Sequence, residues 1–284
     1  MRTVLNGLRW GEGPRASGHA LYVSDPHSKT LWIGESGAWS VHELASPSNG
    51  LGLLPDGTLV AALMDEVEVG RWDGSGFSTY TDLRGVAQGP LGDLTVDADG
   101  GLYVDDVGYA AHRGEPARPG RLLYVAPGGC RASVAAEGLD FPNGLALIDG
   151  GRTLVVAETW RQRLVAFDVT SPGRLTARRT YADLRDPGGT GDIGAEAGAR
   201  LMPDGICAAR DGGVWVATLA GQRIVRVRDG RVSDSLDTAP EHPVAVCAGP
   251  DGRLYATLAS SGGAQLMDAV AQHTVSTRLA EVTP

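Results

Sequence analysis

The sequence predicts an all-β fold, a six-bladed β-propeller with four antiparallel strands per blade around a central channel. Six stretches share one pattern, in which a short apolar strand, a tight turn and a second apolar strand follow one another. They begin at intervals of 37, 43, 51, 61 and 40 residues, the spacing typical of propeller blades. No apolar pattern of helical period extends beyond a turn or two. We therefore expect residues 1–284 to form a single propeller domain.

The first two strands of each blade are expected within these six stretches, which are residues 12–25, 49–63, 92–106, 143–158, 204–218 and 244–257. Four of their turns contain an Asp-Gly pair, because glycine adopts a positive φ without steric cost. These pairs are Asp56–Gly57, Asp99–Gly100, Asp211–Gly212 and Asp251–Gly252.

The outer half of each blade is predicted from the apolar runs between the hairpins. Third strands are expected at residues 31–35, 70–74, 121–127, 163–169 and 223–230, and weaker fourth strands at 40–45, 77–83, 132–139, 177–184 and 231–238. An open last blade would leave an edge that pairs with other chains. We therefore expect residues 3–10 to close it as its outer strand, beside strands at 264–270 and 274–282.

Two connections are long, residues 106–120 and 185–203. Long loops without secondary structure of their own are commonly functional. We expect both to emerge on the face where the inner strands begin and to cap a pocket there.

Composition excludes some partners. The net charge is −9 and no cluster of basic residues is present, which argues against a nucleic-acid surface. No apolar run approaches the ~20 residues of a membrane-spanning helix. The three cysteines, Cys130, Cys207 and Cys247, form no CxxC pair. We expect buried thiols in a reducing, cytoplasmic compartment and a small-molecule substrate. The oligomeric state is left open.

The position seven residues before each hairpin turn is polar in four repeats. These six positions are Glu12, Asn49, Gly92, Asn143, Asp204 and Val244. In a propeller the first residues of the inner strands surround one mouth of the channel, so these oxygen groups should face one another. Unpartnered buried oxygens are costly, and a hard divalent cation is the simplest group to hold them together.

Calcium is the expected ion, because it takes six to eight oxygen ligands. Mn²⁺, Mg²⁺ and Zn²⁺ are alternatives, although these positions hold no histidine or cysteine for a typical zinc site. Substrate contacts are expected from Asn49 and from residues that follow the second strands. These residues are His27, Asp105, Tyr109, His112, Arg113 and Trp160, with Asp25 and Glu158 beside them.

Three segments, WGEGP (10–14), FPNGLALIDGGRTLVVAETWRQRLVAFD (141–168) and MPDGICAARDGGVWVA (202–217), resemble the senescence-marker-protein, gluconolactonase and luciferin-regenerating-enzyme superfamily. The resemblance extends through nearly the whole chain. It implies a six-bladed propeller with one catalytic divalent cation that usually hydrolyses lactones. It also implies that Glu12, Asn143 and Asp204 are the metal ligands.

One repeat departs from the family pattern. The third repeat usually begins with Asn-Asp, and that asparagine contacts metal or substrate, whereas here the residues are Gly92 and Asp93. A water molecule, a reoriented Asp93 or a wider pocket are three ways to fill the position. The departure bears on the substrate, while the three residues matched to the metal ligands are unchanged.

The expected function is metal-assisted hydrolysis of a lactone or related cyclic ester. Asp204 is the first candidate for the catalytic base and Asp93 is the second, because a ligated carboxylate is a weaker base. Two alternatives remain. One is another metal-dependent propeller enzyme, an isomerase, cyclase or phosphotriesterase acting on a non-sugar molecule, and the other is a non-catalytic, metal-stabilised binding propeller.

Overall fold

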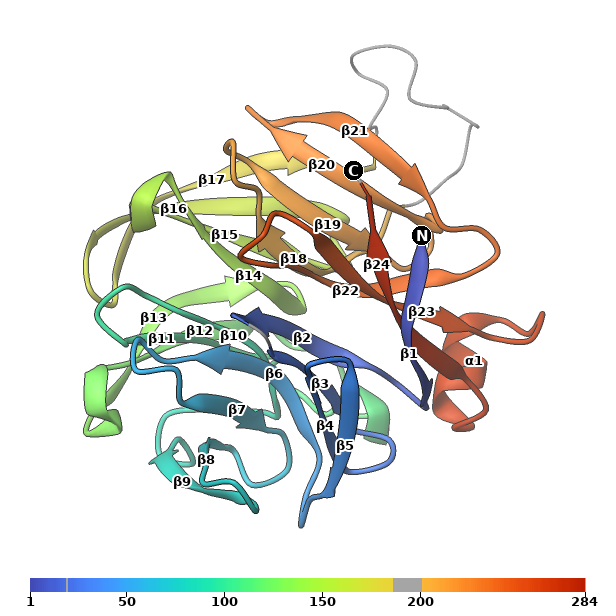
Figure 1. Ribbon diagram of the computed structural model, residues 1–284. Coiled ribbons are helices and arrows are strands. Elements are labelled where there is room, and N and C mark those ends of the chain that lie inside the picture. Colours follow the sequence, from blue (N-terminus) through green and yellow to red (C-terminus); the bar gives the residue numbers. More distant parts are fainter. Residues whose placement is uncertain (19, 186–200, 284) are drawn as a thin grey trace.

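Six four-stranded antiparallel sheets form a ring in the computed structural model, which describes residues 1–18, 20–185 and 201–283 (Figure 1). The expected six-bladed propeller is therefore confirmed. The inner strands of the six blades are β2 (Glu12–Ser17), β6 (Ser48–Leu53), β10 (Leu91–Val96), β14 (Pro142–Ile148), β18 (Pro203–Ala208) and β22 (His242–Ala248).

Each inner strand pairs with the next strand along the chain. The second strands are β3 (Ala20–Asp25), β7 (Leu59–Leu63), β11 (Leu102–Asp106), β15 (Thr153–Glu158), β19 (Val214–Thr218) and β23 (Leu254–Ser260). The third strands are β4 (Thr30–Glu35), β8 (Glu68–Trp72), β12 (Gly120–Val125), β16 (Arg163–Ser171), β20 (Arg223–Arg228) and β24 (Ser276–Val282). The outer strands are β5 (Ala38–Glu43), β9 (Phe77–Asp82), β13 (Ala132–Leu139), β17 (Arg174–Asp183), β21 (Arg231–Asp237) and β1 (Arg2–Leu8).

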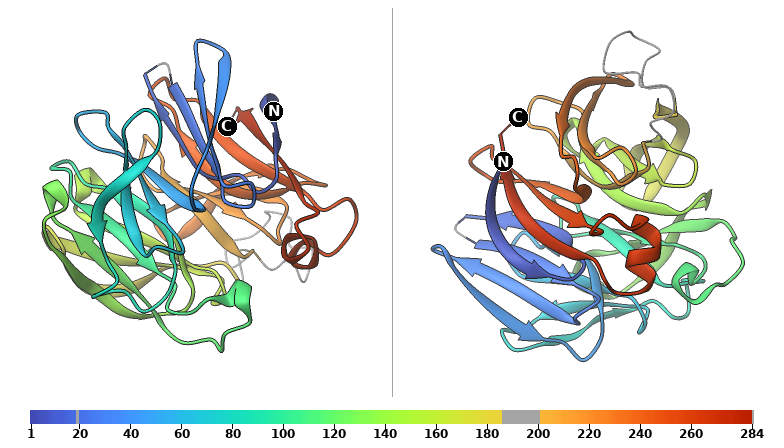
Figure 2. Two further views of the ribbon diagram at one scale, coloured as in Figure 1. Left: turned by 90° about the horizontal axis from the view of Figure 1, so that it is seen from below. Right: turned by 90° about the vertical axis from the view of Figure 1, so that its right-hand side faces the viewer.

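The ring closes through the amino terminus. Strand β1 pairs antiparallel with β24, with Arg2 opposite Glu281 and Leu8 opposite Thr277, and the two strands lie side by side in Figure 2. The expected outer strand of the last blade is thus confirmed. Closure through the first strand gives the last blade the same four strands as the others and removes an unpaired edge.

The strand expected at residues 264–270 is wrong, because this segment contains the helix α1 (Leu266–Ala271). Leu266 and Ala269 are buried in it, and their spacing of three is helical rather than strand-like. They pack with Val244 and Ala259 of the last blade. Among the described residues, no helix is long and apolar enough to cross a membrane.

The rest of the regular structure is short. Within residues 1–18, 20–185 and 201–283, three 3₁₀ turns occur in connections, namely Ala111–Arg113, Pro127–Gly129 and Asp149–Gly151. The first lies between β11 and β12, in the long connection that the sequence predicted at residues 106–120. The other long connection, 185–203, lies mostly outside the described residues.

The core lies between the blades. A separate cluster of buried apolar side chains fills each of the six gaps between neighbouring sheets. Between the third and fourth blades, for example, Tyr103 and Leu122 pack with Leu154 and Val165. Because the second strands lie between two such layers, they are apolar on both faces, and Leu59–Leu63 and Val214–Thr218 are buried throughout.

Every inner strand has an irregularity of register close to its first residue. A β-bulge at this place bends the strand and changes the direction of the side chains. Glycine often follows the anchor position because the neighbouring inner strand comes close. A Cβ on Gly144 would lie 2.4 Å from the backbone nitrogen of Ile206. The repeated bulge and this close approach bring the anchor residues together at one end of the ring.

Candidate metal centre

Asn143 and Asp204 come together where the sequence predicts a metal site. Each is the second residue of its inner strand, β14 and β18, next to each other in the ring (Figure 1). Nδ2 of Asn143 donates a hydrogen bond to Oδ1 of Asp204. Asn143 also donates to the hydroxyl of Thr159 at 3.4 Å, and that hydroxyl donates to the carbonyl of Pro203 at 2.8 Å. Thr159, which the sequence did not single out, therefore links the two strands at the site.

Glu12 begins β2 on another part of the ring, and the indole of Trp10 holds its side chain. Nε1 of Trp10 donates to Oε1 of Glu12 at 2.7 Å. The backbone of Trp10 is fixed in turn, because Oδ1 of Asp25 accepts its N–H at 3.1 Å. Trp10 belongs to the WGEGP segment (10–14). Its contact with Glu12, two positions away, could not be predicted, because the contact depends on the strand beginning at Glu12.

The electrostatics show that the carboxyl groups of the ring are neighbours. Burial raises the pKa of Glu12 well above its ordinary value, and the nearby charge of Asp204 raises it further. Burial also raises the pKa of Asp204, and Asp93 is the next cause. Carboxyl groups raised by burial and by one another are typical of functional sites.

Asp93 has a different environment, since a guanidinium reaches it from β2, two blades away. One terminal nitrogen of Arg15, on β2, lies 3.1 Å from Oδ1 of Asp93 and donates to the carbonyl of Leu94 at 2.8 Å. Burial still raises the pKa of Asp93, while Arg15 opposes the rise. Asp93 is 7% exposed.

Asp105 fills the space that the missing anchor side chain would occupy. A Cβ on Gly92 would lie 2.4 Å from Oδ1 of Asp105. The two carboxylate oxygens of Asp105 accept the N–H groups of Gly92 and Asp93, each at 2.8 Å. Asp105 is completely buried. Glycine at position 92 and aspartate at position 105 are thus a matched pair, and this explains the departure without a water molecule or a reoriented Asp93.

We expect Gly92→Asn to destabilise the protein by about 2–3 kcal/mol, because the new side chain overlaps the Asp105 carboxylate. Gly85→Asn is the matched control, since a Cβ there meets no atom within 4 Å. Chemical denaturation of both variants measures the difference. Equal stability of Gly92→Asn and the wild type would contradict the pairing of Gly92 with Asp105.

Asn49, the fourth oxygen donor expected at the ring, is the second residue of β6 and half-buried. Its backbone carbonyl accepts the hydroxyl of Ser24 at 2.5 Å. Within the part of the chain that the structure describes, its carboxamide makes no hydrogen bond. Asn49 is therefore placed on the ring with a free side chain, and its role as a substrate contact stays a prediction.

Three aromatic residues form a wall beside Asn143. The ring centroids of Phe141 and Trp160 are 4.6 Å apart, and those of Phe141 and Tyr109 are 5.9 Å apart. Nε1 of Trp160 donates to the hydroxyl of Tyr109 at 3.0 Å. Phe141 has a φ of 53°, a strained conformation for a non-glycine residue and one that occurs often at functional sites. Sequence reasoning found Tyr109 and Trp160 and missed Phe141.

The remaining substrate candidates either lie apart from this aromatic wall or have a side chain outside the described part of the structure. Arg113 is exposed and pairs with Asp65 at 2.5 Å. His112 belongs to the same 3₁₀ turn, and its side chain is outside the described part. The ring centroids of His27 and His273 are 4.1 Å apart in a tilted contact, and burial lowers the pKa of His27 to about 4. His27 is therefore neutral at physiological pH, and a role for it at the substrate stays a prediction.

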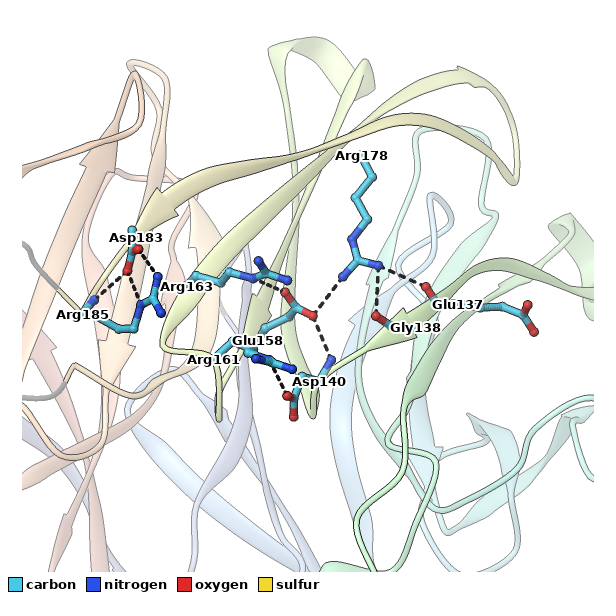
Figure 3. A network of polar contacts seen from close by, with 9 residues as sticks. All are labelled: Glu137, Gly138, Asp140, Glu158, Arg161, Arg163, Arg178, Asp183 and Arg185. Atoms are coloured by element: carbon cyan, nitrogen blue, oxygen red, sulfur yellow. Dashed lines mark hydrogen bonds and ion pairs between the residues drawn. The ribbon is translucent and has the colours of Figure 1, made fainter.

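Glu158 and Asp25 are structural in this arrangement rather than exposed to substrate. Figure 3 shows the Glu158 carboxylate at the centre of a network, where it accepts the N–H of Asp140 at 2.8 Å and contacts Arg163 at 2.5 Å and Arg178 at 3.0 Å. Both acids end a second strand and bind the segment that leads into the inner strand of the same blade. These contacts explain why charged residues occur at buried strand ends.

The donor set suits a hard divalent cation. Oδ1 of Asn143 and Oδ2 of Asp204 accept no hydrogen bond from any described residue, and the Glu12 carboxylate, held by the Trp10 indole and the Gly13 backbone, retains lone pairs for a cation. Carboxylate and carboxamide oxygens are ligands for Ca²⁺, Mg²⁺ and Mn²⁺. Within the described ranges no three His, Cys, Asp or Glu side chains are grouped so as to bind a metal. The candidate set therefore depends on an asparagine as its third member.

Comparison with known proteins relates the chain to lactone-hydrolysing enzymes. A family model described as the SMP-30/Gluconolactonase/LRE-like region matches residues 10–260. The L-arabinolactonase of Azospirillum brasilense is 28% identical over 121 residues, which cover 42% of this chain and 36% of that enzyme. The match therefore spans about a third of the length of this curated relative.

Solved structures share the fold over the full length. A gluconolactonase from Xanthomonas campestris superimposes with a TM-score of 0.74 at 20% identity, covering 99% of this chain and 89% of that one. A calcium-binding protein, regucalcin from Agrobacterium tumefaciens, gives a TM-score of 0.76 at 18% identity, with coverage of 99% and 94%. Identities this low establish a common architecture and leave the chemistry to the site.

Proposed function

The chain belongs to the SMP-30/gluconolactonase/LRE-like family, and from this premise we propose that it is a divalent-metal-dependent hydrolase of a lactone or related cyclic ester. The observation that carries the proposal is that Glu12, Asn143 and Asp204 all stand at the starts of inner strands, with Asn143 bonded to Asp204 and the charge of Asp204 acting on Glu12. The likeness to an L-arabinolactonase supports the same reaction class.

Glu12, Asn143 and Asp204 would hold the cation, and calcium is the ion we favour. Four carboxyl groups, those of Glu12, Asp93, Asp105 and Asp204, influence one another's pKa in this region, and the guanidinium of Arg15 pairs with one of them. A divalent cation offsets the excess negative charge. When bound, it polarises the lactone carbonyl, stabilises the developing oxyanion and lowers the pKa of a nearby water molecule.

The residues of the chain supply the base. Hydrolysis requires that water lose a proton while its oxygen bonds to the carbonyl carbon, and that the ring C–O bond then break with the proton passing to the departing alkoxide. Oδ1 of Asp204 is occupied by Asn143, and its other oxygen belongs to the donor set. Oδ2 of Asp93 accepts no hydrogen bond from the described residues, which favours Asp93 as the proton acceptor.

The aromatic wall indicates where the substrate would lie. Trp160 follows Thr159, whose hydroxyl contacts Asn143, and Phe141 precedes Asn143 by two residues. An aromatic side chain that is open to solvent binds the non-reacting face of a ring by stacking and burial. Trp160 is 38% exposed, so its indole is open to a ligand.

A second candidate reaction follows from the third repeat. Gly92 supplies no side chain, and Asp105 uses both oxygens on backbone N–H groups. The polar contact usual at this position is therefore absent beside an aromatic wall. This favours a non-sugar substrate, for which isomerisation, cyclisation or phosphotriester cleavage on the same cation is the alternative chemistry.

A panel of aldono-, aliphatic and aryl-substituted lactones tests the proposal. Metal-stripped protein is expected to be inactive, and Ca²⁺, Mn²⁺, Mg²⁺ or Zn²⁺ added singly is expected to restore ring opening on at least one lactone. Asp56→Ala, in an exposed hairpin turn, is the matched control and should retain wild-type turnover. Metal binding without turnover on any lactone would reject the hydrolase and favour the alternative chemistry.

A further inference from the structure

Arg15 reaches past the neighbouring blade to contact Asp93, and neither residue belongs to the donor set of Glu12, Asn143 and Asp204. Arg15 lies on β2, whereas Asp93 and Leu94 belong to β10, two blades further on. One terminal nitrogen bonds both Oδ1 of Asp93 and the carbonyl of Leu94, and the other donates to the carbonyl of Pro14 at 2.8 Å. The Arg15 side chain is 19% exposed, so both ends of the contact are largely buried.

The intervening blade leaves room for Asp93. A Cβ on Gly50, in β6, would lie 2.4 Å from Oδ1 of Asp93. The same Cβ would lie 2.5 Å from Cα of Asp93 and 2.6 Å from the backbone nitrogen of Leu94, so a larger residue at position 50 would collide with the strand as well as with the carboxylate. The other neighbours of the guanidinium include the thiols of the partly buried Cys207 and the buried Cys247. Burial raises the pKa of both thiols, to about 12 for Cys247, so they are neutral and do not compete with Asp93 for the positive charge.

Asp93 is held from three directions. Arg15 and the N–H of Leu94, at 2.8 Å, both donate to Oδ1. The backbone N–H of Asp93 donates to Asp105. Oδ2 has no partner among the described residues. A carboxylate with one oxygen fixed and the other free has the arrangement expected of an oriented base.

We propose that Arg15 is a positioning residue that keeps Asp93 ionised and oriented as the base, outside the ligand set of the cation. The inference rests on the proposed function, because it assigns a role within that site. In the reaction Oδ2 of Asp93 takes one proton from water as the water oxygen bonds to the carbonyl carbon. The same proton passes to the ring oxygen when the ring C–O bond breaks, so Asp93 ends as it began.

Metal affinity distinguishes a base from a ligand. Calorimetric titration of metal-stripped protein with Ca²⁺ would compare the wild type with Asp93→Asn, Arg15→Met and the double variant. Asp93→Asn leaves the guanidinium uncompensated near the cation, and we expect affinity to fall about tenfold. The double variant removes both charges, and its affinity should return to within about threefold of the wild type. A double variant as weak as Asp93→Asn would show that Asp93 is a ligand and overturn the proposal.

Kinetics give an independent readout. Arg15→Met and Asp93→Asn should each lower kcat about 10²- to 10⁴-fold with little change in KM, and the double variant should be no slower than the slower single variant. Arg15→Lys keeps the charge and should recover part of the loss. Independent, multiplying losses in Arg15→Met and Asp93→Asn would contradict a shared role.

Arg121→Met is the matched control, because Arg121, on the third strand β12, pairs with the exposed Glu137 of the outer strand β13. This variant should retain wild-type affinity and kcat. Circular dichroism establishes that each variant is folded, and Arg15→Lys carries the test if Arg15→Met is not. A protein that binds the cation but opens no lactone would reject the proposed function, while the affinity cycle would still decide the role of Asp93. A protein that binds no divalent cation would overturn both.

Discussion

Asp204→Ala is expected to abolish cation binding and to lower kcat/KM for the best lactone at least about 10³-fold. The carboxylate of Asp204 accepts a hydrogen bond from the Asn143 carboxamide, and Asp204 is 3% exposed. Its removal takes a charged ligand from a set of three. The loss includes the electrostatic stabilisation of the oxyanion, for which several kcal/mol is the usual scale.

Calorimetry and initial rates measure this loss side by side. Asn143→Ala removes a neutral ligand and should weaken binding less than Asp204→Ala. Asp140→Ala, which removes an exposed partner of Arg161, is the control and should leave both quantities unchanged. Full metal affinity in Asp204→Ala would remove this residue from the candidate centre.

The metal-free protein is expected to lose stability as the pH rises from about 5 to 8. Burial raises the pKa of Glu12, Asp93, Asp105 and Asp204 in the folded state. Above the ordinary carboxyl range, near pH 4, the folded protein therefore binds more protons than the unfolded chain. Its stability must fall with pH until the raised pKa values are passed. Each tenfold change in proton affinity contributes about 1.4 kcal/mol.

Bound calcium should remove this pH dependence, because the cation takes the place of the protons. We expect the melting temperature of metal-free protein to fall by roughly 5 °C or more across the interval, and that of calcium-loaded protein to stay level. His27 acts in the opposite sense below its ordinary pKa, since burial lowers its pKa to about 4. A Glu12→Gln variant shares this effect, so its flatter profile isolates the carboxyl groups. A metal-free protein whose stability rises steadily to pH 8 would contradict the clustered carboxylates.

The fold could be predicted from the sequence because each repeat carries its own local signals for strands and turns. An Asp-Gly turn between two apolar runs specifies a hairpin, and six hairpins at blade spacing specify the ring. The same alignment located Glu12, Asn143 and Asp204 at equivalent strand starts, where the structure also finds them. It failed at residues 264–270, where five apolar residues in seven fit a strand and a short helix equally well.

Contacts between blades could not be predicted in the same way. Arg15 and Asp93 are 78 residues apart, and their pairing depends on the bulges and on the missing side chain at Gly50. Gly92 and Asp105 lie on the two strands of one hairpin. Their contact could not be predicted, because a glycine has no side chain that would indicate a partner. In the sequence, acidic residues at the ends of second strands look the same as residues that line a pocket. In the structure, the Glu158 carboxylate forms ion pairs with Arg163 and Arg178 and accepts a backbone N–H.

Anomalous scattering from crystals of metal-stripped protein soaked in Mn²⁺ tests the central claim most directly. We predict one strong peak on the axis of the ring, within about 2.0–2.6 Å of side-chain oxygens of Glu12, Asn143 and Asp204, with Asp93 outside coordination distance and still paired with Arg15. No peak at this position, or a peak only at another site, would contradict the metal centre and the function built on it.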